Sequence, residues 1–472
     1  MHLNITDKFY KNIRGVAFSL IGLLVILFFY LAYVQIIQED FLANHPLNHR
    51  ALELAAKTQH GTIVDLHGEK LAVSIPDGSG GFKRKYPYGP ITGHVVGYDS
   101  AKYGKTGIES TYSGDLTGLN NPLRHLGPIT SIWKNQPGNN VGLTIDARLQ
   151  ETAYKALGTK RGAIVAISPR TGAILAMVSK PSFDPNSIDQ SWDTVSQAAD
   201  SPLLNRSVQG LYPPGSTLKV MIAEAVLAEK IADRNRIFNC NGALKIGPDY
   251  ILTESNHQAH GKINLEEALA VSCNITFGTL SLELGRNRME KTFERYGFNR
   301  PLGNDLQELS SRLPDFSRLS DGELAQTGIG QGSLLVTPIR MAMLASSFAN
   351  QGIMMQPYLV NQVTAPDGTV VKRFTPKKWL QPSSPQLADI IKQMMITVVN
   401  AGTGSGTRLS GISVAGKTGT AENPHGASHA WFIGFAPADD PQIAIAVIVE
   451  NGGSGGETAA PIARQIFAQA LR

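Results

Sequence analysis

Three short motifs combine residue types that can carry out acyl transfer. They are Ser216-Thr-Leu-Lys219, Ser272-Cys-Asn274 and Lys417-Thr-Gly419. A serine hydroxyl is a poor nucleophile until a neighbouring base removes its proton, and a lysine three residues further along a helix lies on the same face. A lysine can be this base only if burial and a second cation lower its pKa. Lys417 is the candidate for that second cation.

The segment around Ser216 predicts a buried helix with the serine at its start. Tyr212-Pro-Pro-Gly215 precedes the serine, so its hydroxyl should stand near the free backbone N–H groups of a helix N-terminus. Residues 216–230 are apolar on nearly every face, which is typical of a helix enclosed on all sides. A rigid element would therefore hold the nucleophile.

The second and third motifs are predicted at a helix end and in a strand. Asn264 is a plausible cap for a helix over 265–270, which leads to Ser272. Lys417 stands ahead of the apolar run Trp431–Phe435, an arrangement typical of a strand whose edge can pair with an extended peptide.

Further patterns predict strands and helices around the motifs. Apolar runs at 163–167 and 173–178 flank a turn and together predict a β-hairpin. The last residues predict a strand over 443–449, a glycine loop and a helix over 458–471. Residues 38 to 150 hold only short apolar runs, so we expect an irregular β-rich module there, with a loop or linker at 120–140.

The N-terminal segment is predicted to be a membrane anchor. Residues 15–38 contain no charged side chain, and at about 1.5 Å per residue they can cross a hydrocarbon core of about 30 Å. Lys8, Lys11 and Arg14 precede this run, so the positive-inside rule places the first 14 residues in the cytoplasm and the remainder outside. A cleaved signal peptide would have a shorter apolar segment and a small-residue cleavage site.

Composition excludes several other classes of protein. The chain has 472 residues, enough for two to four domains, and 42% of them are hydrophobic, which excludes a disordered chain. Lys and Arg number 43 against 38 Asp and Glu, without a basic run, so we expect no nucleic-acid partner.

The order of the three motifs resembles that of penicillin-binding proteins and serine β-lactamases. Other segments are similar to a class B penicillin-binding protein of the short elongation or division type, namely Leu204-Asn-Arg206, Gly328–Gly332, Thr337-Pro338, Ala415–Glu422 and Trp431–Pro437. More loosely, His60–Asp65 and Gly104–Glu109 resemble the pedestal module of that class.

The resemblance implies an α+β fold. It consists of a penicillin-binding or serine β-lactamase-like transpeptidase domain, with an antiparallel sheet flanked by helices, behind an N-terminal transmembrane helix and a β-rich pedestal module. The expected division is a cytoplasmic tail at 1–14, a transmembrane anchor at 15–38, an N-terminal pedestal module at 39–155 and the transpeptidase domain at 156–472.

The resemblance also implies a role for each motif residue in a monofunctional peptidoglycan D,D-transpeptidase. Ser216 would attack the penultimate D-Ala of a stem peptide, Lys219 would take its proton, and Ser272 would relay a proton to the leaving amine. Asn274 would hold the substrate amide. The terminal carboxylate would be bound by Lys417, Thr418, Gly419 and Thr420, and the oxyanion hole would use the backbone N–H groups of Ser216 and Thr420. β-Lactams would acylate Ser216, and we expect no cofactor and no metal.

The motifs leave alternatives open. A D,D-carboxypeptidase has the same three motifs, and a non-catalytic β-lactam-binding sensor or scaffold of the cell-wall machinery is a further alternative. A β-lactamase is disfavoured because no Glu-x-x-Leu-Asn element follows Ser216. No glycosyltransferase motif precedes the transpeptidase domain, so the resemblance implies a multi-span glycan-polymerising partner of the shape, elongation and division family. The protein would lie in the bacterial cell membrane.

Three further patterns resemble known functional sites, but their sequence context does not support such a function. Gly411–Thr418 fits a Walker A motif, but the residues after it cannot begin the helix that a P-loop needs. Gly452–Gly456 fits G-x-S-x-G, but no His or Asp follows Ser454. The pairs His257 with His260 and His425 with His429 are expected to be solvated loop histidines.

Cys240 and Cys273 permit two interpretations. In an exported protein they could form a disulfide, and the alternative is two buried thiols.

Overall fold

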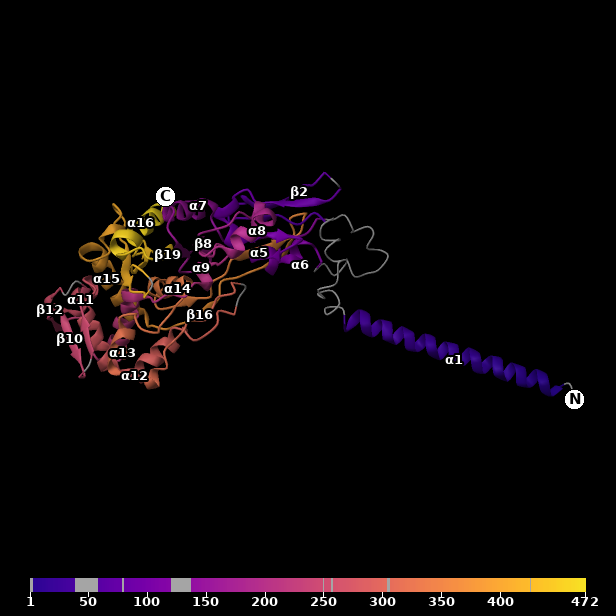
Figure 1. The fold of residues 1–472 in the computed structure, drawn as a ribbon, viewed down its shortest axis with the longest axis horizontal. Helices are drawn as coiled ribbons and strands as arrows, with labels where there is room; N and C mark the ends of the chain where they lie inside the picture. Colours follow the sequence, from indigo (N-terminus) through magenta and orange to yellow (C-terminus); the bar gives the residue numbers. More distant parts are fainter. Residues whose placement is uncertain are drawn as a thin grey trace.

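The computed structural model describes residues 3–38, 58–78, 80–119, 137–248, 250–255, 258–303, 306–424 and 426–472. Most of the expected linker at 120–140 lies outside these residues. Figure 1 shows one long N-terminal helix and a mixed α/β body.

The helix α1 runs over Leu3–Ile36 and starts before the predicted apolar run at 15–38. Its segment Phe9–Val34 is long and apolar enough to cross a membrane, and it is the one such helix in the described part of the chain. Apolar side chains on all of its faces are exposed, which fits a lipid environment. An N-terminal membrane anchor is therefore the interpretation that the structure supports.

A five-stranded antiparallel sheet forms the centre of the body, in the order β17-β18-β19-β7-β8. Its strands are β7 (Gly162–Ile167), β8 (Ile174–Lys180), β17 (Ala415–Ala421), β18 (His429–Ala436) and β19 (Ile443–Val449). The predicted hairpin is confirmed as β7 and β8, and the predicted strand at 443–449 is β19. Because β17 is the first strand in this order, one of its edges has no strand partner in the sheet.

Helices cover both faces of this sheet, which explains why its strands are apolar at successive positions rather than alternately. On one face α14 (Pro338–Ala349) packs against β7, β18 and β19. On the other face lie α7 (Ala147–Leu157) and α16 (Ala460–Ala470), with Ile445, Val447 and their neighbours between them and the sheet. The predicted C-terminal helix is thus confirmed.

A helical region adjoins β17 and carries two of the three motifs. It comprises α10 (Lys219–Ala228), α11 (Leu265–Ala270), α12 (Asn274–Arg295), α13 (Asp321–Gly328) and α15 (Pro385–Ala401). The predicted buried helix is α10, in which the residues from Lys219 to Val226 are all buried. Asn264 caps α11 as predicted, in a reciprocal capping box with Glu267.

Two small antiparallel ribbons extend from this helical region. One pairs β10 (Ala243–Ile246) with β11 (Tyr250–Thr253), and the other pairs β9 (Ile237–Cys240) with β12 (Gly261–Asn264). Figure 1 shows β10, β12 and α11 together at one end of the body.

A second sheet, of six strands in the order β15-β14-β6-β1-β2-β3, confirms the β-rich character of the N-terminal module. Its members are β1 (Ile63–Val64), β2 (Lys70–Pro76), β3 (Phe82–Lys85), β6 (Asn140–Leu143), β14 (Val360–Thr364) and β15 (Val370–Arg373). The last two strands come from the C-terminal half of the chain, and β14 pairs directly with β6. The two halves of the chain therefore share one sheet.

The remaining elements are short or peripheral. They are α4 (Gly93–Val96), β4 (Asp99–Ser100), β5 (Gly104–Lys105), α5 (Gly107–Thr111), α6 (Ser113–Leu116), α8 (Ile188–Gln197), α9 (Arg206–Gln209), β13 (Met354–Met355) and β16 (Lys378–Leu380).

Candidate active site

Ser216 stands in a single 3-10 turn, Gly215–Leu218, that runs directly into α10. Gly215 has φ +54°, a left-handed conformation that favours glycine. Its N–H donates a 2.9 Å hydrogen bond to the carbonyl of Gly330. Backbone contacts therefore fix the residue next to the candidate nucleophile, Ser216.

The turn also packs closely against β17. A Cβ atom at Gly419 would lie 2.9 Å from the side chain of Thr217 and 3.1 Å from the carbonyl of Pro214. The indole N–H of Trp431 donates to the carbonyl of Pro213 at 3.0 Å. A glycine at position 419 allows this approach, so the third motif lies side by side with the turn that carries Ser216.

Lys219 points into the protein from the first turn of α10 and is fully buried. Its ammonium donates to the carbonyl of Ser272 at 2.6 Å and to Oδ1 of Asn274 at 2.8 Å. Burial lowers the pKa of Lys219 to about 8. This lysine can therefore be a neutral base near physiological pH.

Ser272 occupies the link between α11 and α12 with φ +64°, which is uncommon for a residue with a Cβ atom. Its hydroxyl lies 2.9 Å from Nζ of Lys417 and 3.5 Å from Nζ of Lys219. This backbone conformation places one hydroxyl between two amines. Strained residues of this kind are held in place by the surrounding structure and cluster at functional sites.

Lys417 lies in β17 and is also fully buried. Burial, and then the charge of Lys219, hold the pKa of Lys417 well below its usual range. We expected the second cation to lower the pKa of Lys219, but burial is the main cause there. The charge of Lys219 instead contributes to the lowered pKa of Lys417.

The hydroxyls of the third motif stand beside Lys417. Thr418 exchanges a 2.5 Å hydrogen bond with Thr403, and the exposed Thr420 accepts one from the N–H of Gly455 at 3.4 Å. Neither Thr403, which follows α15, nor Gly455, which follows the loop after β19, was predicted from the sequence, because no local pattern ties either residue to β17. Ser216, Lys219, Ser272, Asn274 and Lys417 were all expected to converge, and the motifs that carry them do so.

Comparison with known protein families identifies the family to which a chain with this arrangement belongs. Residues 162–468 match the model of the penicillin-binding protein transpeptidase domain. The chain belongs to that family. Residues 60–141 match the dimerisation domain of penicillin-binding protein A, which places the N-terminal module in the same class of protein.

Relatives extend the match to nearly the whole chain. The peptidoglycan D,D-transpeptidase PbpA of Mycolicibacterium smegmatis is 34% identical over 98% of this chain and 99% of its own. Among solved structures, a ceftriaxone acyl-enzyme complex of penicillin-binding protein A from M. tuberculosis has a TM-score of 0.84 at 32% identity. The match covers 89% of this chain and 100% of the chain in that structure. A D,D-transpeptidase domain from Eggerthella lenta gives a TM-score of 0.81 at 33% identity, over 88% and 99% of the two chains.

The segments that fit the Walker A and G-x-S-x-G patterns have structural roles in this penicillin-binding protein. The end of the Walker-like segment lies inside β17, so no helix N-terminus follows it. Ser454 precedes a π-helical turn, Gly455–Ala459, that packs against β17 and β18.

The expectation of a loop histidine was wrong for His429, whereas His260 does lie in irregular structure and is half-buried. His429 begins β18 and accepts a hydrogen bond from the N–H of Asn451 at 3.1 Å, and His260 lies 3.3 Å from the thiol of Cys240. Strand pairing with β17, which local composition does not reveal, places His429. His257 and His425 lie outside the described residues. The two cysteines are free and buried, so the interpretation as two buried thiols is confirmed over the disulfide.

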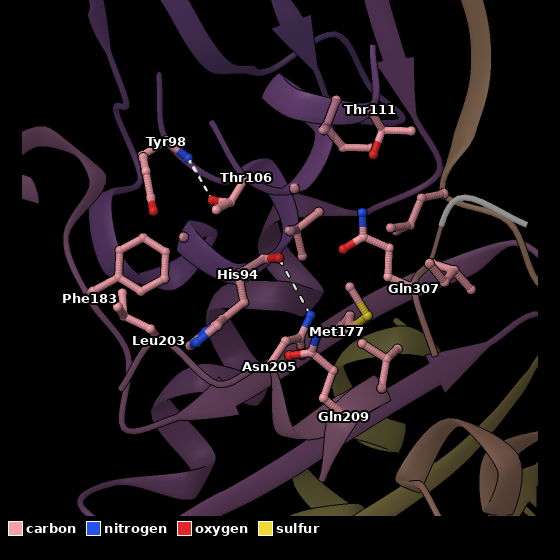
Figure 2. A pocket seen from close by; sticks show the side chains of 17 residues that line it. His94, Tyr98, Thr106, Thr111, Met177, Phe183, Leu203, Asn205, Gln209 and Gln307 are labelled. Atoms are coloured by element: carbon pink, nitrogen blue, oxygen red, sulfur yellow. Dashed lines mark hydrogen bonds between the residues drawn. The ribbon is translucent and has the colours of Figure 1, made fainter. Parts of the chain in front are cut away.

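A separate pocket of about 160 Å³ lies where the N-terminal module meets the transpeptidase domain. Figure 2 shows His94, Phe183 and Asn205 among its lining residues, and none of the motif residues borders it. It is therefore distinct from the candidate active site.

Proposed function

We propose that Ser216 is the nucleophile of this peptidoglycan D,D-transpeptidase, with the motif residues in the roles expected from the sequence. The observation that supports this most directly is the bridge from Lys219 through Ser272 to Lys417. The bridge includes a base of lowered pKa in the first turn of α10, directly after the 3-10 turn that carries Ser216.

In the first half-reaction, Ser216 Oγ attacks the carbonyl carbon of the penultimate D-Ala. The proton of Ser216 passes to Nζ of Lys219. The backbone N–H groups of Ser216 and Thr420 donate hydrogen bonds to the oxyanion of the tetrahedral intermediate. One such donor is typically worth about 10²- to 10³-fold in rate. The C–N bond then breaks, the leaving amine gains a proton through Ser272, and the terminal D-Ala departs.

Substrate binding is assigned to the groups around this bridge. Asn274 holds the substrate amide, and Lys417 with Thr418, Gly419 and Thr420 binds the terminal carboxylate. An incoming carboxylate favours the charged form of a nearby amine, so it would restore the positive charge that burial disfavours on Lys417. The free edge of β17 suits an extended stem peptide, whose backbone can pair with it.

In the second half-reaction, an amine of another stem peptide attacks the acyl-enzyme and Ser216 leaves with a proton. A new amide bond replaces the ester, which gives the crosslink. β-Lactams follow the first half-reaction and leave a stable ester on Ser216.

The topology is proposed as expected from the sequence, with residues 1–14 cytoplasmic, 15–38 in the membrane, 39–155 as the pedestal module and 156–472 as the catalytic domain outside. The basic residues Lys8, Lys11 and Arg14, which lie in α1 just before its uncharged run, support this orientation. We propose a multi-span glycosyltransferase of the shape, elongation and division family as the partner that polymerises the glycan.

A donor and acceptor assay tests the reaction. The full-length chain in detergent is incubated with a synthetic stem peptide ending in D-Ala-D-Ala and with a labelled D-amino acid as acceptor. We expect a new amide product together with free D-Ala, and neither with Ser216→Ala or Lys219→Ala. Lys160→Ala, which changes an exposed lysine, is the control and should match the wild type. Hydrolysis without amide product would favour the carboxypeptidase, and turnover by Ser216→Ala would contradict the nucleophile.

A further inference from the structure

Four side chains beside the second motif form a cluster that the acyl-transfer steps do not use. Cys240, Glu254, His260 and Cys273 each offer one ligand atom, and these atoms all lie within 4.8 Å of one another. The two cysteines and the glutamate are buried, and the histidine is half-buried. A cluster of two thiols, an imidazole and a carboxylate has the composition of a metal site.

The four residues come from different elements that meet at one point. Cys240 is the last residue of β9, and His260 precedes β12, whose first residue pairs with Cys240. Glu254 follows β11, and Cys273 is the N-cap of α12. Both ribbons and the second catalytic motif therefore contribute ligands.

The distances in the cluster match a small coordination shell. Sγ of Cys240 lies 3.3 Å from Nδ1 of His260 and 3.5 Å from Oε1 of Glu254, and Sγ of Cys273 lies 3.0 Å from the same carboxylate oxygen. In a tetrahedral zinc site with bonds of about 2.0–2.3 Å, neighbouring ligand atoms are about 3.3–3.8 Å apart. Only small side-chain movements would bring four ligand atoms to that spacing.

We propose that Cys240, Glu254, His260 and Cys273 bind one zinc ion in a closed structural site. Zinc accepts thiolate, imidazole and carboxylate ligands in tetrahedral geometry. Magnesium and calcium favour shells of oxygen ligands, which this cluster lacks. With both thiols ionised, the three negative ligands and the divalent ion would leave one net negative charge on the site.

Hydrogen bonds around the cluster support ionised ligands. The backbone N–H and the hydroxyl of Thr276 both donate to Sγ of Cys273, at 3.3 and 3.2 Å. The N–H of Ile275 donates to Oε1 of Glu254 at 2.8 Å. These donors stand at the N-terminus of α12, where the helix dipole favours negative charge. Outer hydrogen bonds of this kind orient and stabilise metal ligands.

The site would join the two ribbons, each of only two strands, to the N-terminus of α12. An isolated two-stranded ribbon is marginally stable in water, and Ile237 and Ile251 on the two ribbons are exposed. A metal that joins both ribbons to Cys273 would hold the backbone between Ser272 and Asn274. Those two residues contact Lys219, so the zinc ion would position the second motif without touching the substrate.

Metal content of the full-length chain, purified in detergent without chelators, tests the proposal. We expect about one zinc per chain, two thiols that react only after denaturation and chelation, and a lower melting temperature after zinc removal. Replacement by Co²⁺ should give thiolate-to-cobalt charge-transfer absorption, which reports sulfur ligation independently of activity.

Two variants and a control locate the site. Loss of an outer hydrogen-bond partner typically weakens metal binding 10- to 100-fold, so Cys240→Ser and His260→Gln should weaken zinc binding by more than about 10-fold. Lys262→Ala, an exposed change in β12, should retain the metal. If a variant fails to fold, the cobalt spectrum of the wild type still decides.

Three results would overturn the proposal. The first is a wild-type chain without zinc, both as purified and after incubation with Zn²⁺. The second is zinc retained equally by the Cys240→Ser/His260→Gln double variant. The third is an unreduced chain lighter by two hydrogens, which would mean a disulfide.

Discussion

The Nζ atom of Lys417 lies 2.9 Å from the Oγ atom of Ser272, although 145 positions separate the two residues in the chain. Lys219 contacts the carbonyl of the same serine at 2.6 Å. A single residue, held at a positive φ, therefore connects the two buried amines. This arrangement is the geometric basis for the proposed role of Ser272 as a proton relay between the base and the leaving group.

Replacement of Ser272 should separate the role of its hydroxyl from that of its backbone. Ser272→Ala and Ser272→Gly both remove the relay, and we expect each to slow acylation by penicillin by about 10²- to 10⁴-fold, the range of general acid–base catalysis. Glycine also relieves the positive φ, so Ser272→Gly should be the more thermostable of the two. Stopped-flow acylation and thermal melting measure both effects. Wild-type acylation by Ser272→Gly would contradict the relay.

The rate of acylation should depend on pH through the base. Because Lys219 has a pKa of about 8 and must be neutral to accept a proton, the rate should rise with pH, about tenfold per unit below 8, and level off above it. In the unfolded chain this lysine has its ordinary pKa of 10.5, so the unfolded state binds more protons between these values and the free energy of unfolding should rise with pH there. A flat rate profile from about pH 6 to 9 would contradict Lys219 as the base.

A comparison of two glycines tests the fixed position of the nucleophile turn. Gly330 and Gly332 have φ +80° and +79°, but a Cβ atom at Gly330 would lie 2.0 Å from the carbonyl oxygen of Gly215, and one at Gly332 would meet nothing nearer than 3.7 Å. Gly332→Ala should cost only the backbone strain of about 1–2 kcal/mol. Gly330→Ala should in addition displace the turn and abolish acylation. Equal acylation rates in the two variants would contradict this.

His94 should make the fold sensitive to acid. Burial lowers the pKa of His94 to about 4, and its Nε2 lies 2.9 Å from the carbonyl of Pro202. The unfolded chain binds this proton near the ordinary value of 6.5, so the free energy of unfolding should fall as the pH drops from 6.5 towards 4. Melting temperatures across this range measure the loss. His94→Gln, which can donate the same hydrogen bond without titrating, should show a smaller loss; an identical loss would assign the acid sensitivity to other groups.

Local features of the fold were predictable because they depend on neighbouring residues. Asn264, as a plausible cap, predicted the helix before Ser272, and the apolar run after Ser216 predicted a buried helix. Pairings across long stretches of chain were not predictable in this way. The addition of β14 and β15 to the N-terminal sheet depends on tertiary packing, and no pattern within residues 360–373 indicates it.

The candidate site, too, was predictable where short motifs mark its residues and unpredictable where distant segments meet. Motif order was enough to select Ser216, Lys219 and Ser272, whereas the contact of Thr403 with Thr418 requires the return of the chain after α15. The cluster around Cys240 was also missed, because its members lie on two ribbons and a helix end whose meeting no local spacing encodes. Burial of the helix that carries Lys219 was predictable from its apolar faces, but only the folded structure shows that burial, and not a second cation, lowers the pKa of this lysine.

The most direct test of the central claim is the intact mass of the full-length chain after incubation with penicillin, beside Ser216→Ala. We predict one stable penicilloyl adduct on the wild type, mapped by peptide mass to the turn Gly215–Leu218, and none on the variant. An adduct on folded Ser216→Ala, or no adduct on a wild-type chain shown to be folded, would contradict the assignment of Ser216 as the nucleophile.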